Sequence, residues 1–385
     1  MPPHAAARRD ETPELPPIGR SAVLTHHWLV RRRGGERVLE GLARLVPGAP
    51  LYTLIHDADS YGPFPHDKAD GPRAVHASLL QHLPGARRRH QPLLPLMPIA
   101  ARLMRLPPVD VVICSDAAIA KAMRADDRSR VVCYCHSPMR YVWEPEMSAR
   151  YAEEAPRALR PLWPALCGYL RRCDAAAVRR VDVFVANSRH VAERIRRCYG
   201  RESVVVHPWV DAPPAPHVGR REDYYLCVGH HVGYKRLDLA VAACERLGRR
   251  LVVIGDGPQA RRLGRGRPPG SRVEFLGRQP DRVVAEHYRA ARALLFPGEE
   301  DFGIVPLEAM AHGCPVVAYG VGGAVETVLD GRTGRLFSEP TVEGLAAAVL
   351  DVEHTEFDPG ALHAHAREFS RERFMRAMQA LLTAS

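Results

Sequence analysis

The sequence predicts an α/β protein built from two parallel sheets that are covered by helices. Short apolar runs alternate with segments of helical periodicity along the chain, which is the order typical of parallel strands joined by helical crossovers. The length of 385 residues suits two domains, each with its own core. The stretch 208–221, within PWVDAPPAPHVGRRE, interrupts all periodicity and marks the boundary between the two halves.

These features divide the chain into a tail, two domains and a closing helix. Residues 1–20 are rich in proline and charge and lack an apolar signal core, so we expect a disordered tail. Residues 21–207 and residues 208–364 are each predicted to form a Rossmann-like domain around a parallel sheet. The last segment, about 365–385, has helical periodicity and is expected to cross back to the first domain.

Each expected element follows from a local pattern of apolar residues. Strands are expected at 21–25, 51–55, 109–115, 131–136, 183–186, 204–207, 225–228, 251–254, 273–276, 293–296 and 315–319. Helices are expected at 36–45, 117–124, 159–180 and 190–199, and further helices are expected to begin near residues 237, 258, 283, 305, 324 and 341. Because parallel strands end at one edge of their sheet, both sheets would present that edge to a shared cleft.

Composition narrows the class of protein. An apolar content of 46% with 25% charged residues is typical of a soluble globular chain, and no apolar run of about 18 residues predicts a membrane-spanning helix. The nine cysteines include no Cys-x-x-Cys pair, so we expect free thiols in a reducing cytoplasm. A net charge of +10 favours polyanions or an anionic membrane surface, whereas sparse aromatic residues argue against nucleic acid.

The segment LLFPGEEDFGIVPLE contains the strongest functional signal. An apolar strand runs through a Pro-Gly turn and an acidic pair into a helix, and Glu300 and Glu308 lie eight positions apart. The start of this helix would present free N–H groups, and a helix N-terminus suits phosphate. The residues that would supply this site are Phe302, Gly303, Ile304 and Val305. Because carboxylates repel phosphate, Glu300 and Glu308 are expected to bind hydroxyl groups, so the pattern indicates a nucleotide sugar.

Two further strand ends of the second half carry candidate ligand groups. In LCVGHHVGYKRLDLAV, Lys235 and Arg236 follow a strand and a glycine-containing loop, where they could reach a diphosphate. The competing interpretation is a solvated basic pair. Gly277 ends the strand FLG, where a glycine permits a ligand to approach the backbone. In VGGAVETV, Glu326 follows a glycine pair, and a capped surface helix is an equally good interpretation.

The first half has glycines at the start of a helix and histidines at the ends of strands, where they could contact a ligand. Gly34 and Gly35 precede a helix, where they could accept a phosphate or allow tight packing. His136 ends the strand RVVCYCH, a position that makes a catalytic role as reasonable as a structural one. The same ambiguity applies to His26 and His27.

Two other features bear on metals and membranes. The sequence contains no His-Glu-x-x-His motif, no Asp-x-Asp motif and no acidic cluster spaced for Mg²⁺, which predicts a metal-free site. Residues 79–108 mix leucine, proline and arginine. They could rest on anionic lipid, or they could form a core helix with a solvated basic face. The arginines concerned are Arg87, Arg88, Arg89, Arg102 and Arg105.

Together these motifs resemble the retaining family-4 glycosyltransferases, which have a GT-B fold of two Rossmann-like domains that face each other across a cleft. The resemblance extends from residue 21 onward. The motif FPGEEDFGIVPLEAMAHGCPVVAYGVGGAVETV is similar to the Glu-x7-Glu region of that family. The motifs YCHSPMRYVWE, GGERVLE, VANSRHVAERI and GYKRLD look closest to bacterial O-antigen mannosyltransferases.

In the second domain, the resemblance implies a nucleotide-sugar site. Glu308 would hold the ribose hydroxyls, and Glu300 would lie beside the donor sugar. The backbone of residues 302–305 would lie near the sugar and the diphosphate. Lys235 and Arg236 would pair with the diphosphate.

In the first domain, which would face the acceptor, the resemblance implies fewer contacts. His136 would reach the donor sugar across the cleft, and Gly34 and Gly35 would border the phosphate or the acceptor. Relatives commonly have an arginine before the lysine loop, where this chain has His230. That difference leaves more of the phosphate charge to Lys235 and Arg236 and argues against a role for His230.

The expected activity is therefore hexose transfer with retention of configuration and without a metal or other cofactor. The resemblance favours GDP-mannose as the donor, and a glycan, a lipid-linked molecule or a small molecule as the acceptor. A nucleotide-sugar epimerase, a phosphorylase of the same build and a non-catalytic binder of anionic lipid remain alternatives. An NAD-dependent oxidoreductase is disfavoured because no Gly-x-Gly-x-x-Gly follows the first strand. We expect a cytoplasmic protein that can lie peripherally on the inner leaflet.

Overall fold

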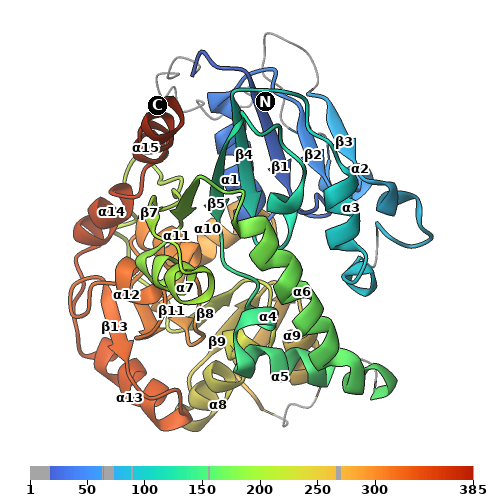
Figure 1. Ribbon diagram of the computed structural model, residues 1–385. Coiled ribbons are helices and arrows are strands. Elements are labelled where there is room, and N and C mark those ends of the chain that lie inside the picture. The colour runs from blue at the N-terminus through green and yellow to red at the C-terminus, as the bar shows by residue number, and fades with distance from the viewer. Residues whose placement is uncertain are drawn as a thin grey trace, which may run out of the picture.

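The computed structural model describes residues 18–62, 64, 73–87, 90–154, 157–265 and 270–384. Two α/β domains follow one another along the chain, and the C-terminal helices lie beside both of them (Figure 1). Every strand pair in both sheets is parallel. The prediction of a two-domain α/β fold is therefore confirmed.

The first sheet has the strand order β3-β2-β1-β4-β5-β6-β7 within the described residues. The order reverses between β1 and β4, and such a switch point is where open α/β sheets bind ligands. The strands are β1 (Ala22–His26), β2 (Leu51–Thr53), β3 (Val75–Ala77), β4 (Val111–Asp116), β5 (Arg130–Cys135), β6 (Val183–Ala186) and β7 (Ser203–Val205).

The second sheet has the order β10-β9-β8-β11-β12-β13. Its switch point lies between β8 and β11, so the loops that leave these two strands are the natural place for a ligand. The strands are β8 (Tyr225–Val228), β9 (Leu251–Ile254), β10 (Val273–Gly277), β11 (Ala293–Phe296), β12 (Val316–Tyr319) and β13 (Gly334–Phe337).

Helices cover both faces of each sheet. The first domain contains α1 (Gly34–Leu45), α2 (Ala58–Tyr61), α3 (Met97–Leu103), α4 (Arg140–Trp143), α5 (Pro145–Glu154), α6 (Trp163–Val178) and α7 (Arg189–Tyr199), with the short 3-10 helices η1 (Leu79–His82), η2 (Gln91–Leu93), η3 (Ala120–Ala122) and η4 (Arg157–Leu162). The second part contains η5 (Gly233–Lys235), α8 (Leu237–Leu247), α9 (Pro258–Arg265), α10 (Asp281–Ala290), α11 (Ile304–Ala311), α12 (Ala324–Thr327), α13 (Val342–Glu353), α14 (Pro359–Arg367) and α15 (Arg371–Thr383).

The C-terminal segment joins the two domains. Leu362 of α14 is buried in the core of the second domain. Phe374 and Met378 of α15 are buried instead among the side chains of α1 and the first sheet. The chain thus crosses back to the first domain, as the sequence predicted, although two helices separated by residues 368–370 make the crossing.

The chain start differs from the expected tail. Residues 1–17 lie outside the described part of the chain. Ile18 is buried in the first-domain core, and Arg20 Nη2 donates a hydrogen bond to the carbonyl of Thr383 at 3.0 Å. Residues 18–20 therefore pack on the first domain instead of belonging to the tail.

Several local predictions were wrong. The strands β3 and β13 were not expected, and the helix predicted at 117–124 is only the short turn η3. The reason is Asp116, whose carboxylate accepts the N–H groups of Ala118 and Ala120 and so stabilises a tight loop in place of a helix. The helix expected at 159–180 is divided into η4 and α6, with Pro161 inside η4 and a proline in the first turn of α6. Among the described helices, none has the length and apolar character that a membrane crossing requires.

Candidate active site

The switch point of the second sheet brings a cation and a carboxylate together. Lys235 follows β8, Glu300 follows β11, and the Lys235 Nζ lies 2.7 Å from Glu300 Oε1. Their side chains are 22% and 18% exposed. The sequence singled out both residues, and the topology places them side by side because β8 and β11 are neighbours. The cavity that these two residues help to line measures about 20 Å³, so little free space lies beside the pair.

A glycine lets the two loops approach each other. A Cβ atom at Gly298 would lie 2.5 Å from the Cα of Lys235 and 2.7 Å from the carbonyl oxygen of Tyr234. Only glycine fits there without moving backbone. Arg236 follows with a left-handed backbone, φ 51°, a strained conformation for a residue other than glycine. Its Nε lies 3.2 Å from Asp238 Oδ2, so Lys235 and Arg236 pair with different carboxylates.

The helix start after Glu300 is a candidate anion site. Gly303 precedes α11 with φ 92°, and no side chain of the described residues caps this helix. The helix begins at Ile304, so the predicted residues Phe302 to Val305 do form its N-terminus. Uncapped N–H groups at a helix start favour negative charge.

The glycine pair at 322–323 supports the acidic loop. Gly323 N–H donates to the carbonyl of Glu300 at 2.8 Å. A Cβ atom at Gly323 would lie 2.3 Å from the Cα of Phe302. The VGG motif is therefore explained by close packing beneath residues 300–302.

Glu308 lies on α11 and is enclosed by two groups that sequence reasoning missed. Tyr288 OH donates to Glu308 Oε2 at 3.1 Å, and Arg37 Nη1 donates to Oε1 at 3.4 Å. Burial raises the pKa of Glu308. Arg37 belongs to α1, so a first-domain cation lies where the sequence analysis places ribose hydroxyls.

His136 directly follows the end of β5. A Cβ atom at Gly35 would lie 3.6 Å from its ring, so Gly35, in the first turn of α1, lies directly against the imidazole. Burial lowers the pKa of His136 to about 4, which leaves the ring neutral near pH 7. The carboxylate of Asp301, on the opposite domain, acts on this ring electrostatically. Gly35 therefore lies beside a candidate catalytic group, whereas the contact of Gly34 and Gly35 with a phosphate or acceptor stays a prediction.

Two arginines of the first domain hold the acidic loop of the second. Arg194 is 1% exposed, and its guanidinium pairs with Asp301 and with Glu144, the latter at 2.6 Å. Arg140 Nη2 lies 3.3 Å from Glu299 Oε1. Contacts with His190 and the nearby arginines lower the pKa of Glu299 to about 2. The loop is therefore anchored by charge across the domain interface.

Arg140 lies in the motif YCHSPMRYVWE, and Arg194 lies in the motif VANSRHVAERI. Nothing in the spacing of either motif assigned a role to its arginine. Each has an acidic partner more than 100 positions away along the chain.

Glu326 forms a second link between the domains. Its carboxylate accepts the N–H groups of Arg189 and His190 at 2.9 and 3.0 Å, so it caps α7 of the first domain. His207 Nε2 lies 2.9 Å from the same carboxylate, and its ring stacks on Phe302 with centroids 5.5 Å apart. Sequence reasoning considered a cap on its own surface helix, whereas Glu326 caps a helix of the other domain.

His230 and Gly277 both contact the loop that follows β9. His230 Nδ1 is 2.8 Å from Asp256 Oδ1, and Arg278 approaches the same carboxylate at 3.2 Å. Burial lowers the pKa of His230. Gly277 ends the edge strand β10 with φ 66°, and its carbonyl accepts the Gly255 N–H at 2.7 Å. Because β9 separates β10 from β8, Gly277 does not lie at the switch point.

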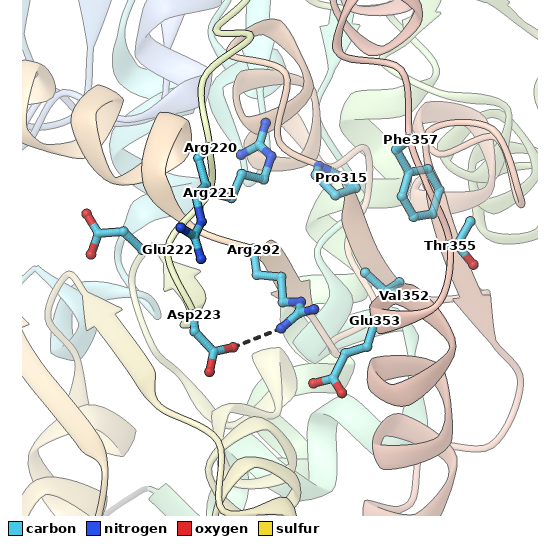
Figure 2. A pocket seen from close by; sticks show the side chains of 10 residues that line it. All are labelled: Arg220, Arg221, Glu222, Asp223, Arg292, Pro315, Val352, Glu353, Thr355 and Phe357. Carbon is cyan, nitrogen blue, oxygen red and sulfur yellow. Dashed lines mark hydrogen bonds and ion pairs between the residues drawn. The ribbon is translucent and has the colours of Figure 1, made fainter.

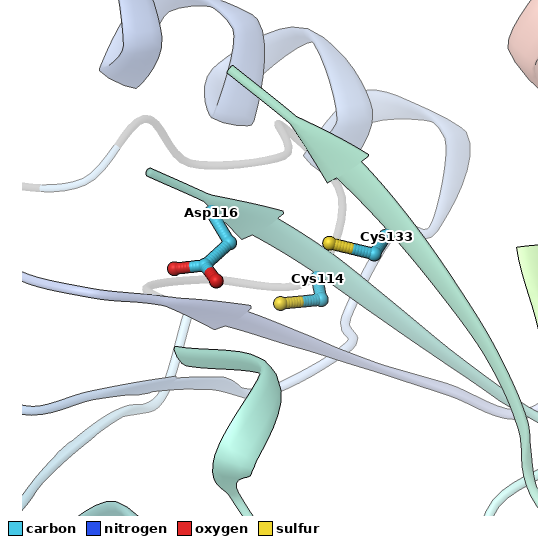
Figure 3. A group of neighbouring side chains, drawn as sticks. All are labelled: Cys114, Asp116 and Cys133. Carbon is cyan, nitrogen blue, oxygen red and sulfur yellow. The ribbon is translucent and has the colours of Figure 1, made fainter. Parts of the chain in front are cut away.

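A group of candidate metal ligands lies inside the first domain. Ligand atoms of Cys114, Asp116 and Cys133 lie within 4.8 Å of one another (Figure 3). Lys121 Nζ already binds the Asp116 carboxylate at 2.8 Å. A hydrogen bond with Cys114 and burial raise the pKa of Cys133 well above its ordinary value. Since metals bind thiolates, this group is a poor metal site.

A cavity of about 860 Å³ lies elsewhere in the second domain (Figure 2). Its lining includes Arg292 and Pro315, which immediately precede β11 and β12, so it lies at the opposite ends of the strands from Lys235. Arg292 pairs with Asp223 at 2.9 Å, and Glu353 pairs with Arg249, which lies outside the cavity lining, at 2.7 Å. This cavity is therefore separate from the candidate active site.

Comparisons with known proteins identify the family. Residues 32–212 match the model for "Glycosyltransferase Family 4", and residues 222–354 match "Glycosyl transferases group 1". These two matches cover most of both domains. The chain therefore belongs to the family-4 glycosyltransferases, which have a GT-B fold.

Individual relatives agree with this assignment. A glycogen synthase of Mycobacterium tuberculosis is 31% identical over 239 residues, which is 58% of this chain and 57% of the relative. A GDP-mannose-dependent alpha-(1-6)-phosphatidylinositol monomannoside mannosyltransferase of Mycolicibacterium smegmatis is 32% identical over 210 residues, which is 46% of this chain and 55% of the relative. The chain thus spans little more than half the length of these relatives.

A solved structure shows the same fold over nearly the whole chain. The crystal structure of HepE from Anabaena in complex with UDP-glucose has a TM-score of 0.62 and 18% identity, and the match covers 94% of this chain and 99% of HepE. At this level of identity, the likeness concerns the fold alone.

Proposed function

We propose that the protein transfers a hexose from a nucleotide sugar to an acceptor. The observation that carries this proposal is the Lys235–Glu300 pair at a sheet switch point, next to the uncapped N-terminus of α11. A cation and free N–H groups suit a diphosphate, and nearby carboxylates suit sugar hydroxyls. Family membership supports the same activity.

In this proposal, the bound donor replaces the ion pairs Lys235–Glu300 and Arg37–Glu308 with contacts of its own. Lys235 would pair with the diphosphate in place of Glu300, and Glu300 would then lie beside the sugar. Glu308 would bind the ribose hydroxyls in place of Arg37. Lys235, Arg236 and the helix terminus would stabilise the charge that develops on the leaving diphosphate, without a metal, as preorganised electrostatics.

Retention of configuration is part of the proposal. His136 is neutral near pH 7 because burial lowers its pKa to about 4, so it would act toward the sugar through hydrogen bonding. No residue assigned to the site is an obvious nucleophile. We therefore propose a same-face attack by the acceptor, assisted by an oxygen of the leaving phosphate.

The donor is proposed to be GDP-mannose. The motif resemblance favours a mannosyltransferase, and one relative is a GDP-mannose-dependent mannosyltransferase. HepE was crystallised with UDP-glucose, which makes UDP-glucose the leading competitor. A glycan, a lipid-linked molecule or a small molecule would be the acceptor.

Thermal unfolding with a panel of nucleotide sugars tests this proposal. At 100 times its dissociation constant, a ligand stabilises the folded state by about 2.7 kcal/mol. We expect GDP-mannose to raise the melting temperature more than UDP-glucose does. Incubating the stabilising donor without an acceptor separates an epimerase from a transferase, since only an epimerase would convert it. If no nucleotide sugar stabilises the protein, the proposed function is wrong.

An exposed apolar surface supports a peripheral location on the cytoplasmic leaflet of a membrane. We define the η1–α3 surface by five apolar side chains that are between 40% and 79% exposed: Leu79, Leu83, Leu96, Ile99 and Leu103. Arg87, Arg102 and Arg105 are exposed in the same segment, whereas Arg88 and Arg89 lie outside the described residues. Residues 73–109 contain no acidic residue. This combination suits anionic lipid, where each basic residue contributes about 1 kcal/mol near the surface.

Vesicle sedimentation tests the membrane proposal. We expect the double variant Ile99→Ser/Leu103→Ser to bind anionic phospholipid vesicles about tenfold more weakly or worse, because immersing one such side chain contributes about 1.5–3 kcal/mol. The control Val218→Ser/Leu350→Ser removes exposed apolar side chains elsewhere and should bind as the parent does. Equal binding of both variants would contradict this location.

A further inference from the structure

Three residues form a hydrogen-bonded chain at the switch point of the first sheet. His26 ends β1, Ser115 lies in β4, and His136 follows β5. His26 Nδ1 lies 2.9 Å from the carbonyl oxygen of Ser115 and 3.1 Å from its Oγ. Ser115 Oγ lies 2.9 Å from His136 Nε2. His26 and Ser115 are both 0% exposed, so water does not compete for these contacts.

The partners determine where each proton lies. A carbonyl oxygen only accepts hydrogen bonds, so His26 Nδ1 must carry a hydrogen. Ser115 Oγ faces that same N–H and accepts from it. The hydroxyl hydrogen of Ser115 is then left with one acceptor among the described residues, His136 Nε2. His136 Nε2 therefore has no hydrogen, and in a neutral ring the proton lies on Nδ1.

The surroundings of His136 agree with this tautomer. Gly35 lies against the Nε2 side of the ring, because a Cβ atom at Gly35 would lie 3.6 Å from Nε2. In the described part of the chain, the hydrogen bond of the His136 ring involves Nε2, and Nδ1 has no protein partner. The Nδ1–H group is thus free to meet a ligand. On the far side of the chain, His26 Nε2 lies 3.9 Å from Glu36 Oε1, and the His27 ring lies against His26 with centroids 4.0 Å apart.

We propose that Ser115 and His26 are positioning residues that hold His136 in the Nδ1–H tautomer, so that His136 presents a hydrogen-bond donor to an oxygen of the bound sugar. This inference rests on the proposed function for the identity of the ligand, but the tautomer itself does not depend on it. With this tautomer the sugar oxygen accepts the hydrogen bond, whereas the alternative tautomer would present a lone pair from Nδ1 and would need a hydroxyl that donates.

Nitrogen-15 NMR of the full chain labelled at histidine tests the tautomer directly. A His136→Asn variant assigns the signals of this ring. We expect the parent protein to show protonated Nδ1 and unprotonated Nε2 at neutral pH. In Ser115→Ala the hydroxyl donor is lost, so we expect the His136 signals to shift toward the Nε2–H form, and Ser115→Thr should restore the parent pattern. An Nε2–H tautomer in the parent protein would overturn the proposal.

Kinetics provide the second measurement. We expect Ser115→Ala to lower kcat about tenfold, in line with the loss of one hydrogen bond, with a smaller change in KM for the donor. The control Ser129→Ala removes another buried hydroxyl of the first domain, one that donates to the Val109 carbonyl at 2.6 Å, and should leave kcat and the His136 signals unchanged. An unchanged kcat and tautomer in a folded Ser115→Ala protein would also overturn the proposal. If the parent protein transfers no sugar, the proposed function fails while the tautomer result stands.

Discussion

Replacing Lys235 with alanine is expected to lower the turnover number about 10²–10³-fold, the usual cost of removing one preorganised partner of a developing charge. Lys235 Nζ lies 2.7 Å from Glu300 at the switch point of the second sheet. Arg236, the adjacent cation, already pairs with Asp238, so it cannot fully replace the lost charge. Steady-state kinetics with the cognate donor would measure the effect.

Two controls separate catalysis from folding and from general charge. Lys235→Arg keeps the cation and should retain more activity than Lys235→Ala. Arg282→Ala removes an 87% exposed cation from α10 and should turn over as the parent does. Normal turnover by a folded Lys235→Ala protein would show that the diphosphate does not depend on this residue.

Replacing Lys121 with methionine is expected to destabilise the first domain by about 3–5 kcal/mol, because it leaves two buried carboxylates without their cation. Lys121 Nζ lies 2.8 Å from Asp116 Oδ2 and 2.6 Å from Asp174 Oδ1, and the three side chains are 0–2% exposed. Burial opposes the charge on Lys121, but the two carboxylates raise its pKa well above the ordinary value. Urea unfolding followed by tryptophan fluorescence would measure the loss.

The same network explains why the effect should spread through the domain. Trp143 Nε1 and Tyr199 OH donate to Asp174 Oδ2 at 2.7 and 2.9 Å, so α4, α6 and α7 all depend on that carboxylate. The double variant Lys121→Met/Asp174→Asn should recover part of the lost stability, since an amide oxygen still accepts both bonds without a charge. If the urea concentration at the midpoint of unfolding is the same for Lys121→Met and for the parent protein, the ion pairs contribute nothing to stability.

Much of the second domain could be predicted from local pattern. The strands β8, β9 and β11 have the bounds that apolar runs predicted, and α11 begins one residue before the expected position. Lys235, Glu300 and the helix terminus at Gly303 meet at the switch point because strand order in such sheets follows general rules. Local pattern failed at β3 and β13, which are short edge strands with few apolar residues.

The contacts between the domains could not be predicted. Arg194 binds Asp301, Arg140 binds Glu299, and Glu326 caps a helix more than 100 positions earlier in the chain. Nothing in the spacing of these residues distinguishes them from solvated charges on a helix surface. The contact between Arg37 and Glu308 is likewise a contact between the domains that the sequence did not predict.

The sequence by itself determined the two parallel sheets, their strand–turn–helix junctions and the residues that those junctions carry, because apolar periodicity and glycine placement act over a few neighbouring residues. Only the tertiary structure decided which charges pair across the cleft and which nitrogen of His136 bears the proton. Those properties depend on distances between residues far apart in the chain, and such distances are fixed only when the two domains pack.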